Sequence, residues 1–69
     1  MTPTDYRLAI KAVGLPSQNA AGRFFGVTEV TGRRWASFGP PAPVAKFLRL
    51  MVALKFTAAY VEDVISDPL

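Results

Sequence analysis

The side chains best suited to chemistry lie between Ser17 and Ser37. Within that stretch Arg33 and Arg34 are adjacent, and each carries a planar, permanently charged group with several N–H donors. Such a group matches acceptors that are arranged in pairs, as on a phosphate or on the edge of a guanine base. The pattern therefore predicts binding to a polyanion.

Catalytic chemistry is poorly supported by the composition. The chain has no histidine and no cysteine, so it lacks the usual zinc ligands and the commonest catalytic base and nucleophile. Glu62 and Asp63 are neighbours on a predicted helix and do not converge as an acid–base pair. The sequence also has no phosphate-binding loop. We expect no enzymatic activity, no cofactor, no metal and no small-molecule ligand.

Glycine, proline and capping residues divide the chain into five predicted helices, and no stretch shows strand-like alternation. The helices cover about residues 3–13, 18–25, 28–37, 43–54 and 57–65. Four begin after a side chain that can cap a helix, namely Thr2, Ser17, Thr28 and Thr57. The first helix has one apolar face, formed by Tyr6, Ala9, Ile10 and Val13. The predicted fold class is all-α, a compact five-helix domain over residues 1–69 whose tail, residues 66–69, frays.

The stretch from Ser17 to Ser37 has the spacing of a helix-turn-helix. Gly22 is small enough for two helices to approach closely, and Gly26 can adopt the turn conformation that most residues resist. Val27 is placed to plug the gap between the helices. The spacing of Trp35 turns its ring inward, which leaves both arginines on the solvent side.

These residues resemble the lambda-repressor-like or XRE-type helix-turn-helix regulators, in particular the short phage and bacterial ones. The resemblance is carried by Gly26-Val27-Thr28 and Arg33-Arg34-Trp35, and it covers residues 17–37 firmly and 2–65 more loosely. It implies a lambda-repressor-like arrangement of the helices and sequence-specific binding to double-stranded DNA. Such proteins usually bind as a dimer on a two-fold-related site, commonly to repress transcription.

Transferred by position, the resemblance implies which side chains contact DNA. Base edges in the major groove would be met by Thr28, Glu29, Val30, Arg33 and Arg34. Phosphates would be held by Ser17, Gln18, Asn19, Arg23 and Ser37. Arg34 would bind a guanine, Glu29 would accept from a cytosine amino group, and Val30 would touch a thymine methyl. Two assignments have a second interpretation, because Arg33 could hold a phosphate and Glu29 could simply complement the helix dipole.

One position departs from the family. Gly32 stands where relatives usually have Val or Ile packing on the preceding helix, and glycine also lowers helix propensity by roughly 1 kcal/mol. Either Phe25 or Phe38 fills the space, or the two helices come unusually close. We expect crowding from the nearby phenylalanines, so that Gly32→Val would clash.

The second half of the chain has more apolar residues than one small core can bury. The surplus, within residues 44–65, predicts a homodimer interface that includes Leu50, Leu54, Phe56, Tyr60 and Val64. An alternative function draws on the same surplus: a protein-interaction module, antitoxin-like or adaptor, that uses this fold to bind another protein.

Charge is unevenly distributed along the chain. The net charge is +3, but residues 1–56 carry +6 and residues 57–69 carry −3, which suggests a basic body that meets a polyanion and an acidic end that faces elsewhere. The basic residues are spread over several helices, which disfavours a membrane-surface protein. The N-terminus lacks the apolar stretch of a signal peptide, and Arg49 and Lys55 interrupt the apolar region 47–56, so we expect a cytoplasmic protein.

Overall fold

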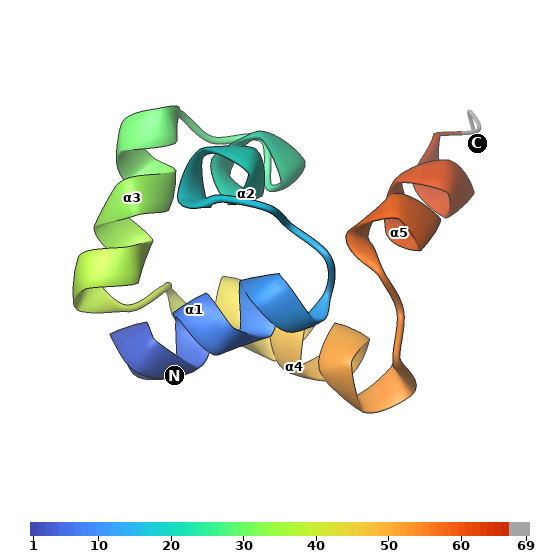
Figure 1. Cartoon of the computed structure of the whole chain (residues 1–69), viewed down its shortest axis with the longest axis horizontal. Helices are drawn as coiled ribbons and strands as arrows, with labels where there is room; N and C mark the ends of the chain where they lie inside the picture. Colours follow the sequence, from blue (N-terminus) through green and yellow to red (C-terminus); the bar gives the residue numbers. More distant parts are fainter. Residues whose placement is uncertain (67–69) are drawn as a thin grey trace.

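Five α-helices are found in residues 1–66, which are the residues described by the computed structural model (Figure 1). They are α1 (Pro3–Ala12), α2 (Gln18–Phe24), α3 (Glu29–Phe38), α4 (Ala42–Leu54) and α5 (Ala58–Ile65). These residues form no strand, so the predicted all-α fold class is confirmed. Of the tail predicted to fray, residues 67–69 lie outside the described residues, whereas Ser66 donates a hydrogen bond to the Asp63 carbonyl oxygen at 2.8 Å.

The helices begin where their capping side chains predict. Each of the four predicted caps accepts a hydrogen bond from the backbone N–H three residues later, at 3.0–3.2 Å. At α1 the cap is reciprocal, because the Asp5 carboxylate also accepts from the Thr2 backbone N–H. The exception is α4, which begins after Pro41 without a side-chain cap and carries Pro43 in its first turn.

The core lies between α1, α3 and α4. All four apolar residues predicted on one face of α1 are buried, and Trp35 and Leu48 pack against them. The Trp35 ring meets the Tyr6 ring edge-on, with 6.2 Å between the ring centroids, so the inward orientation predicted for Trp35 is confirmed. Phe24 and Phe25 are half-buried and pack against this core.

Tyr6 brings a polar atom into the centre of the core. The residue is fully buried, and its hydroxyl has no hydrogen-bond partner among the described residues. Burial disfavours the charged phenolate and raises the pKa of Tyr6 above its usual value of 10.0. The buried hydroxyl therefore stays protonated where an exposed tyrosine would begin to ionise.

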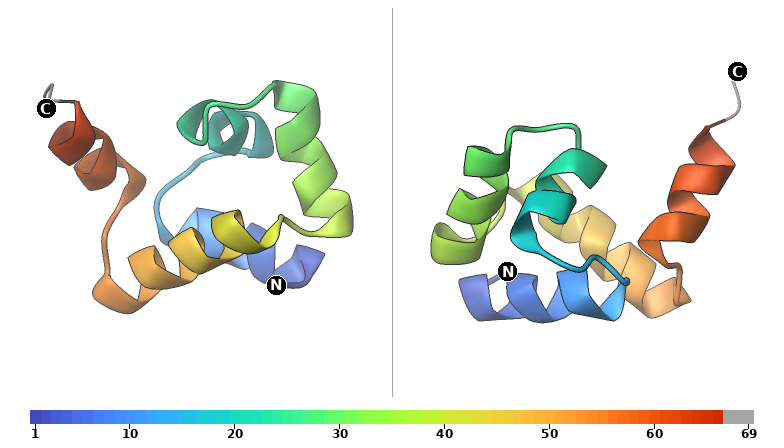
Figure 2. Two further views of the ribbon diagram at one scale, coloured as in Figure 1. Left: turned by 180° about the vertical axis from the view of Figure 1, so that it is seen from behind. Right: turned by 45° about the horizontal axis from the view of Figure 1, so that its top comes forward.

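The helices are arranged so that α3 and α5 lie at opposite ends of the molecule. In all views α2 and α3 pack together at one end, α1 and α4 run alongside each other, and α5 stands beyond the far end of α4 (Figures 1 and 2). Only Ala58 and Val61 of α5 are buried. The Ala58 backbone N–H donates to the Val13 carbonyl oxygen at 2.8 Å, which ties the start of α5 to the end of α1.

Candidate nucleic-acid interface

The contact between α2 and α3 is made by two glycines. A Cβ atom on Gly32 would lie 2.6 Å from the Gln18 carbonyl oxygen and 3.0 Å from the Gly22 Cα. Side chains of any size are excluded at that distance, so α3 rests directly on the backbone of α2. The structure therefore confirms the close approach of the two helices that Gly22 and Gly32 predict.

No phenylalanine fills the space beside Gly32. Phe38, one of the two candidates, is 80% exposed, so the first alternative is wrong and the second, an unusually close approach of the helices, is confirmed. The phenylalanines are also not the source of the crowding that we expected there. Phe25 packs instead on the Trp35 ring, with 5.7 Å between the centroids. The space beside Gly32 is closed by the Gln18 carbonyl and the Gly22 backbone, because the two helices lie so close together.

A short connection between α2 and α3 fixes the angle at which α3 leaves. Gly26 has a φ of 73°, the left-handed conformation predicted for it. The next residue, Val27, donates from its backbone N–H to the Gly22 carbonyl oxygen at 2.9 Å, and its half-buried side chain packs against the core. Both roles predicted from this turn are confirmed.

The face of α3 that points away from the core is exposed along its whole length. Its buried residues, Gly32, Trp35 and Ala36, lie on one side of the helix. The opposite side carries Val30, 55% exposed, together with Arg34 one turn further on. All five residues predicted to meet bases are exposed, namely Thr28, Glu29, Val30, Arg33 and Arg34.

Two polar contacts connect this face to α2, and the sequence did not predict either of them. Arg23 forms an ion pair with Glu29, with 3.4 Å between Nη1 and Oε1, and both side chains are more than half exposed. Arg33 donates from Nη1 to the Asn19 Oδ1 at 3.0 Å. Each contact joins a residue predicted to hold phosphate to one predicted to read bases. Arg34 makes no such bond among the described residues.

Four of the residues predicted to hold phosphate lie together on α2 or at its start. Ser17 caps the helix, Gln18 and Asn19 are half-buried in its first turn, and Arg23 is exposed near its end. Ser37 is separate, because it lies eight residues after Glu29 on α3, about 12 Å along the helix axis. The predicted phosphate contacts thus form one cluster and one outlier.

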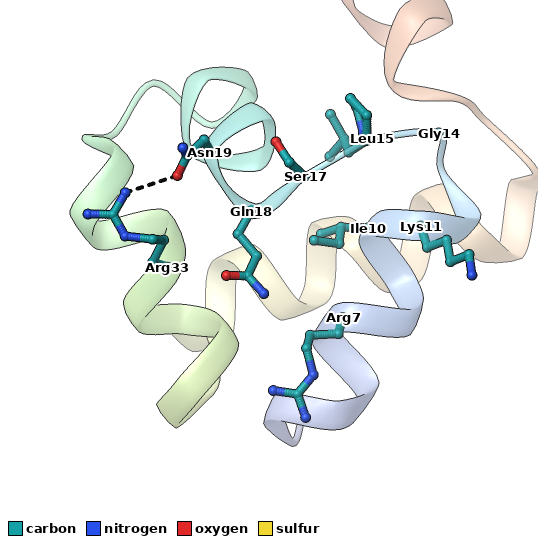
Figure 3. A pocket seen from close by; sticks show the side chains of 10 residues that line it. Arg7, Ile10, Lys11, Gly14, Leu15, Ser17, Gln18, Asn19 and Arg33 are labelled. Atoms are coloured by element: carbon teal, nitrogen blue, oxygen red, sulfur yellow. Dashed lines mark hydrogen bonds between the residues drawn. The ribbon is translucent and has the colours of Figure 1, made fainter.

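Arg7 joins α1 to α3 and was not identified from the sequence. Its Nη1 donates to the Ala36 carbonyl oxygen at 2.6 Å, and its Nη2 donates to the Thr4 Oγ1 at 3.3 Å. Arg7 also lines a groove of about 790 Å³ that runs between α1 and the start of α2 and includes Arg33 of α3 (Figure 3). No local pattern predicts this contact, since Arg7 and Ala36 lie 29 positions apart.

Residues 1–66 contain neither a metal-binding cluster nor a helix that could span a membrane. Comparison with protein-family models, curated proteins and solved structures finds no match to this chain. The exposed face of α3, with the polar start of α2 beside it, is the best-supported candidate site.

Proposed function

We propose that this chain is a sequence-specific double-stranded DNA-binding regulator of transcription, acting as a repressor, with α2 and α3 forming a helix-turn-helix. The observation that carries the proposal is the outward face of α3, where Val30, Arg33 and Arg34 are exposed on a helix held rigidly by its backbone contact with α2. A helix with its side chains is about 10–12 Å wide, which matches a major groove about 12 Å wide. The proposal places the protein in the cytoplasm, with its DNA.

The residues at the start and on the outward face of α3 have distinct chemical roles in this proposal. Arg34 is free of side-chain partners among the described residues, so its guanidinium can pair with the O6 and N7 atoms of a guanine. Val30 offers an apolar contact to a thymine methyl. Thr28 and Glu29 stand at the start of the helix, and Glu29 must share its carboxylate between Arg23 and a cytosine amino group.

Helix α2 fixes the position of the protein on the DNA backbone in the same proposal. Gln18 and Asn19 offer neutral donors, and Arg23 offers a positive charge. The bond from Arg33 to Asn19 directs that guanidinium toward α2, which supports a phosphate contact for Arg33 over a base contact. Arg34 is then the principal reader of sequence.

We further propose that two copies bind a two-fold-related site through α4 and α5. All five predicted interface residues are exposed, and a groove of about 200 Å³ between the two helices is lined by apolar and aromatic side chains alone. Among the described charges, α4 carries Lys46 and Arg49 without an acid, and α5 carries Glu62 and Asp63 without a base. A two-fold axis that sets α4 of one copy against α5 of the other buries the apolar face and pairs opposite charges.

A second candidate function draws on the same apolar face. An antitoxin-like or adaptor module would use α4 and α5 to bind a different protein, with DNA binding secondary or absent. The exposed aromatic residues Phe56 and Tyr60, whose ring centroids are 4.9 Å apart, favour a protein contact of some kind. The two functions differ in whether the chain alone binds duplex DNA with sequence preference.

The deciding experiment is selection of duplexes from a random-sequence library by the purified chain, followed by affinity measurements at several salt concentrations. The DNA immediately upstream of the gene is the first natural duplex to include. A DNA-binding regulator enriches a motif with two-fold symmetry and binds it at least about 10³ times more tightly than random DNA. Failure to bind any duplex at low salt would reject the proposal in favour of the interaction module.

A further inference from the structure

The groove between α1 and the start of α2 contains two cations, Arg7 and Lys11, that are not among the predicted DNA-contacting residues. We propose that it holds the sugar–phosphate backbone of the DNA, so that Arg7 and Lys11 of α1 belong to the DNA-binding surface. This inference rests on the proposed function, since it names a part of the same surface. It enlarges that surface from two helices to three.

The groove gathers positive charge from two helices. Its volume is about 790 Å³, and its polar lining consists of Arg7, Lys11, Ser17, Gln18, Asn19 and Arg33. Three of these residues are cations, and no carboxylate lines the groove. A hollow lined by charges of one sign concentrates the electrostatic field and attracts ions of the opposite sign.

None of the three cations forms an ion pair within residues 1–66. Arg7 uses two of its N–H groups on a carbonyl and a hydroxyl, and Arg33 donates to the neutral amide of Asn19. Lys11 forms no ion pair among the described residues. Arg23, in contrast, has Glu29 as a partner within 4 Å. Arg23 is therefore paired, whereas the three cations that gather in the groove have no ion pair among the described residues.

The groove is continuous with the face of α3 that we propose enters the major groove. Arg33 belongs to both, since it lies on α3 and also lines the hollow. Arg7 is fixed to α3 through the Ala36 carbonyl, and Figure 3 shows Arg7 and Gln18 projecting into the space between α1 and α3. Lys11 points to the outer side of α1 in the same view. A DNA strand that leaves α3 on the Arg33 side therefore passes Gln18 and Arg7 before it reaches Lys11.

The groove contacts carry no sequence information. They are directed at phosphates, which are the same at every base pair, so they contribute equally to operator and random DNA. Each neutralised phosphate also releases counterions and steepens the dependence of affinity on salt. These two properties distinguish a groove contact from a base contact such as the one proposed for Arg34.

The test is Lys11→Gln, compared with Lys55→Gln as the matched control. Lys55 lies at the end of α4 remote from α3, so its replacement removes the same charge outside the groove (Figure 1). For each bound copy we expect Lys11→Gln to weaken binding about five- to eightfold at roughly 0.1–0.15 M salt, on operator and random duplexes alike, and to reduce the slope of log affinity against log salt by about 0.9. When a dimer binds, the two fold-losses multiply and the two slope changes add. Lys55→Gln and the charge-conserving Lys11→Arg should match the wild type in both measurements.

Other outcomes separate the two proposals. If the wild type binds its operator and Lys11→Gln leaves affinity and salt slope unchanged, the groove inference is wrong and the proposed function stands. A loss confined to the operator would also overturn it, because Lys11 would then read sequence. Binding of inorganic phosphate in the groove, with no effect of Lys11→Gln on DNA, would assign the site to a free anion instead. If the wild type binds no duplex at all, the proposed function itself fails.

Discussion

Gly32 and Gly22 bring two helices into backbone contact, with 3.0 Å between the Cβ position of one and the Cα of the other. Replacing Gly32 by alanine or valine improves helix propensity, yet the new Cβ would lie 2.6 Å from the Gln18 carbonyl oxygen, which cannot move without moving α2. We expect Gly32→Val to lower the free energy of unfolding by about 1–3 kcal/mol. Thermal denaturation followed by circular dichroism measures the change.

The control is Ser37→Val, which places the same β-branched side chain on the exposed face of α3. It should change stability by no more than about 0.5 kcal/mol. A clear rise in the melting temperature of Gly32→Val would show instead that the helices have room between them.

Arg34 provides the prediction on specificity. Loss of a bidentate contact to guanine costs roughly 1–3 kcal/mol, so Arg34→Ala should weaken operator binding by that amount and relax the preference at one base pair. Arg23→Ala should weaken all duplexes about equally and flatten the salt dependence. Fluorescence anisotropy with operator and random duplexes measures both, and equal losses on the two duplexes for Arg34→Ala would remove it from the base-reading residues.

The buried hydroxyl of Tyr6 costs stability, because it gives up water without gaining a partner among the described residues. Tyr6→Phe should therefore raise the free energy of unfolding at neutral pH by about 1 kcal/mol. Tyr60→Phe removes a hydroxyl from a residue that is 51% exposed and should have no effect. Urea denaturation of the three proteins is the measurement, and lower stability of Tyr6→Phe would indicate a hydrogen bond to that hydroxyl.

Burial of Tyr6 should also make the stability of the protein depend on pH in the alkaline range. Burial raises the pKa of Tyr6, so above pH 10.0 the unfolded chain gives up this proton while the folded chain retains it. Unfolding then becomes more favourable as the pH rises, and the stability of the wild type falls. Tyr6→Phe lacks this contribution. The difference in free energy of unfolding between Tyr6→Phe and the wild type should therefore grow as the pH rises above 10. A difference that stays constant with pH would contradict the assignment.

The proposed dimer is tested by two leucines with similar exposure on different helices. Leu50 of α4 is 54% exposed and belongs to the predicted interface, whereas Leu8 of α1 is 62% exposed and lies outside it. In sedimentation equilibrium at micromolar concentration we expect the wild type and Leu8→Asp at twice the chain mass of 7.5 kDa, and Leu50→Asp at the monomer mass. A monomeric wild type would reject a dimer in solution.

The features that the sequence predicts well are formed by residues close together along the chain. The caps at Ser17 and Thr28 and the turn at Gly26 depend on residues within a few positions of one another, so their chemistry can be recognised without a structure. The exposed face of α3 follows from helical spacing in the same way. The close approach at Gly32 is a partial case, since the sequence singles out this glycine but does not show that the Gln18 carbonyl oxygen lies against it.

The contacts that the sequence does not predict are those between residues that are distant along the chain. The bond from Arg7 to Ala36 spans 29 positions and the bond from Arg33 to Asn19 spans 14, and neither belongs to a repeating pattern. An arginine on a predicted helix is most simply interpreted as surface charge. The role of Arg7 and the groove beside it becomes visible only when α1 and α3 are placed side by side.

The position of α5 gives the molecule an electric dipole. Glu62 and Asp63 belong to α5, which lies at the opposite end of the molecule from α3, and α3 carries Arg33 and Arg34 (Figure 2). A polyanion exerts a torque on such a molecule and turns its positive end forward while the two are still separated by water. In the proposed function, the acidic helix therefore acts before any contact forms, because it makes α3 and the groove beside it the leading side of an encounter with DNA.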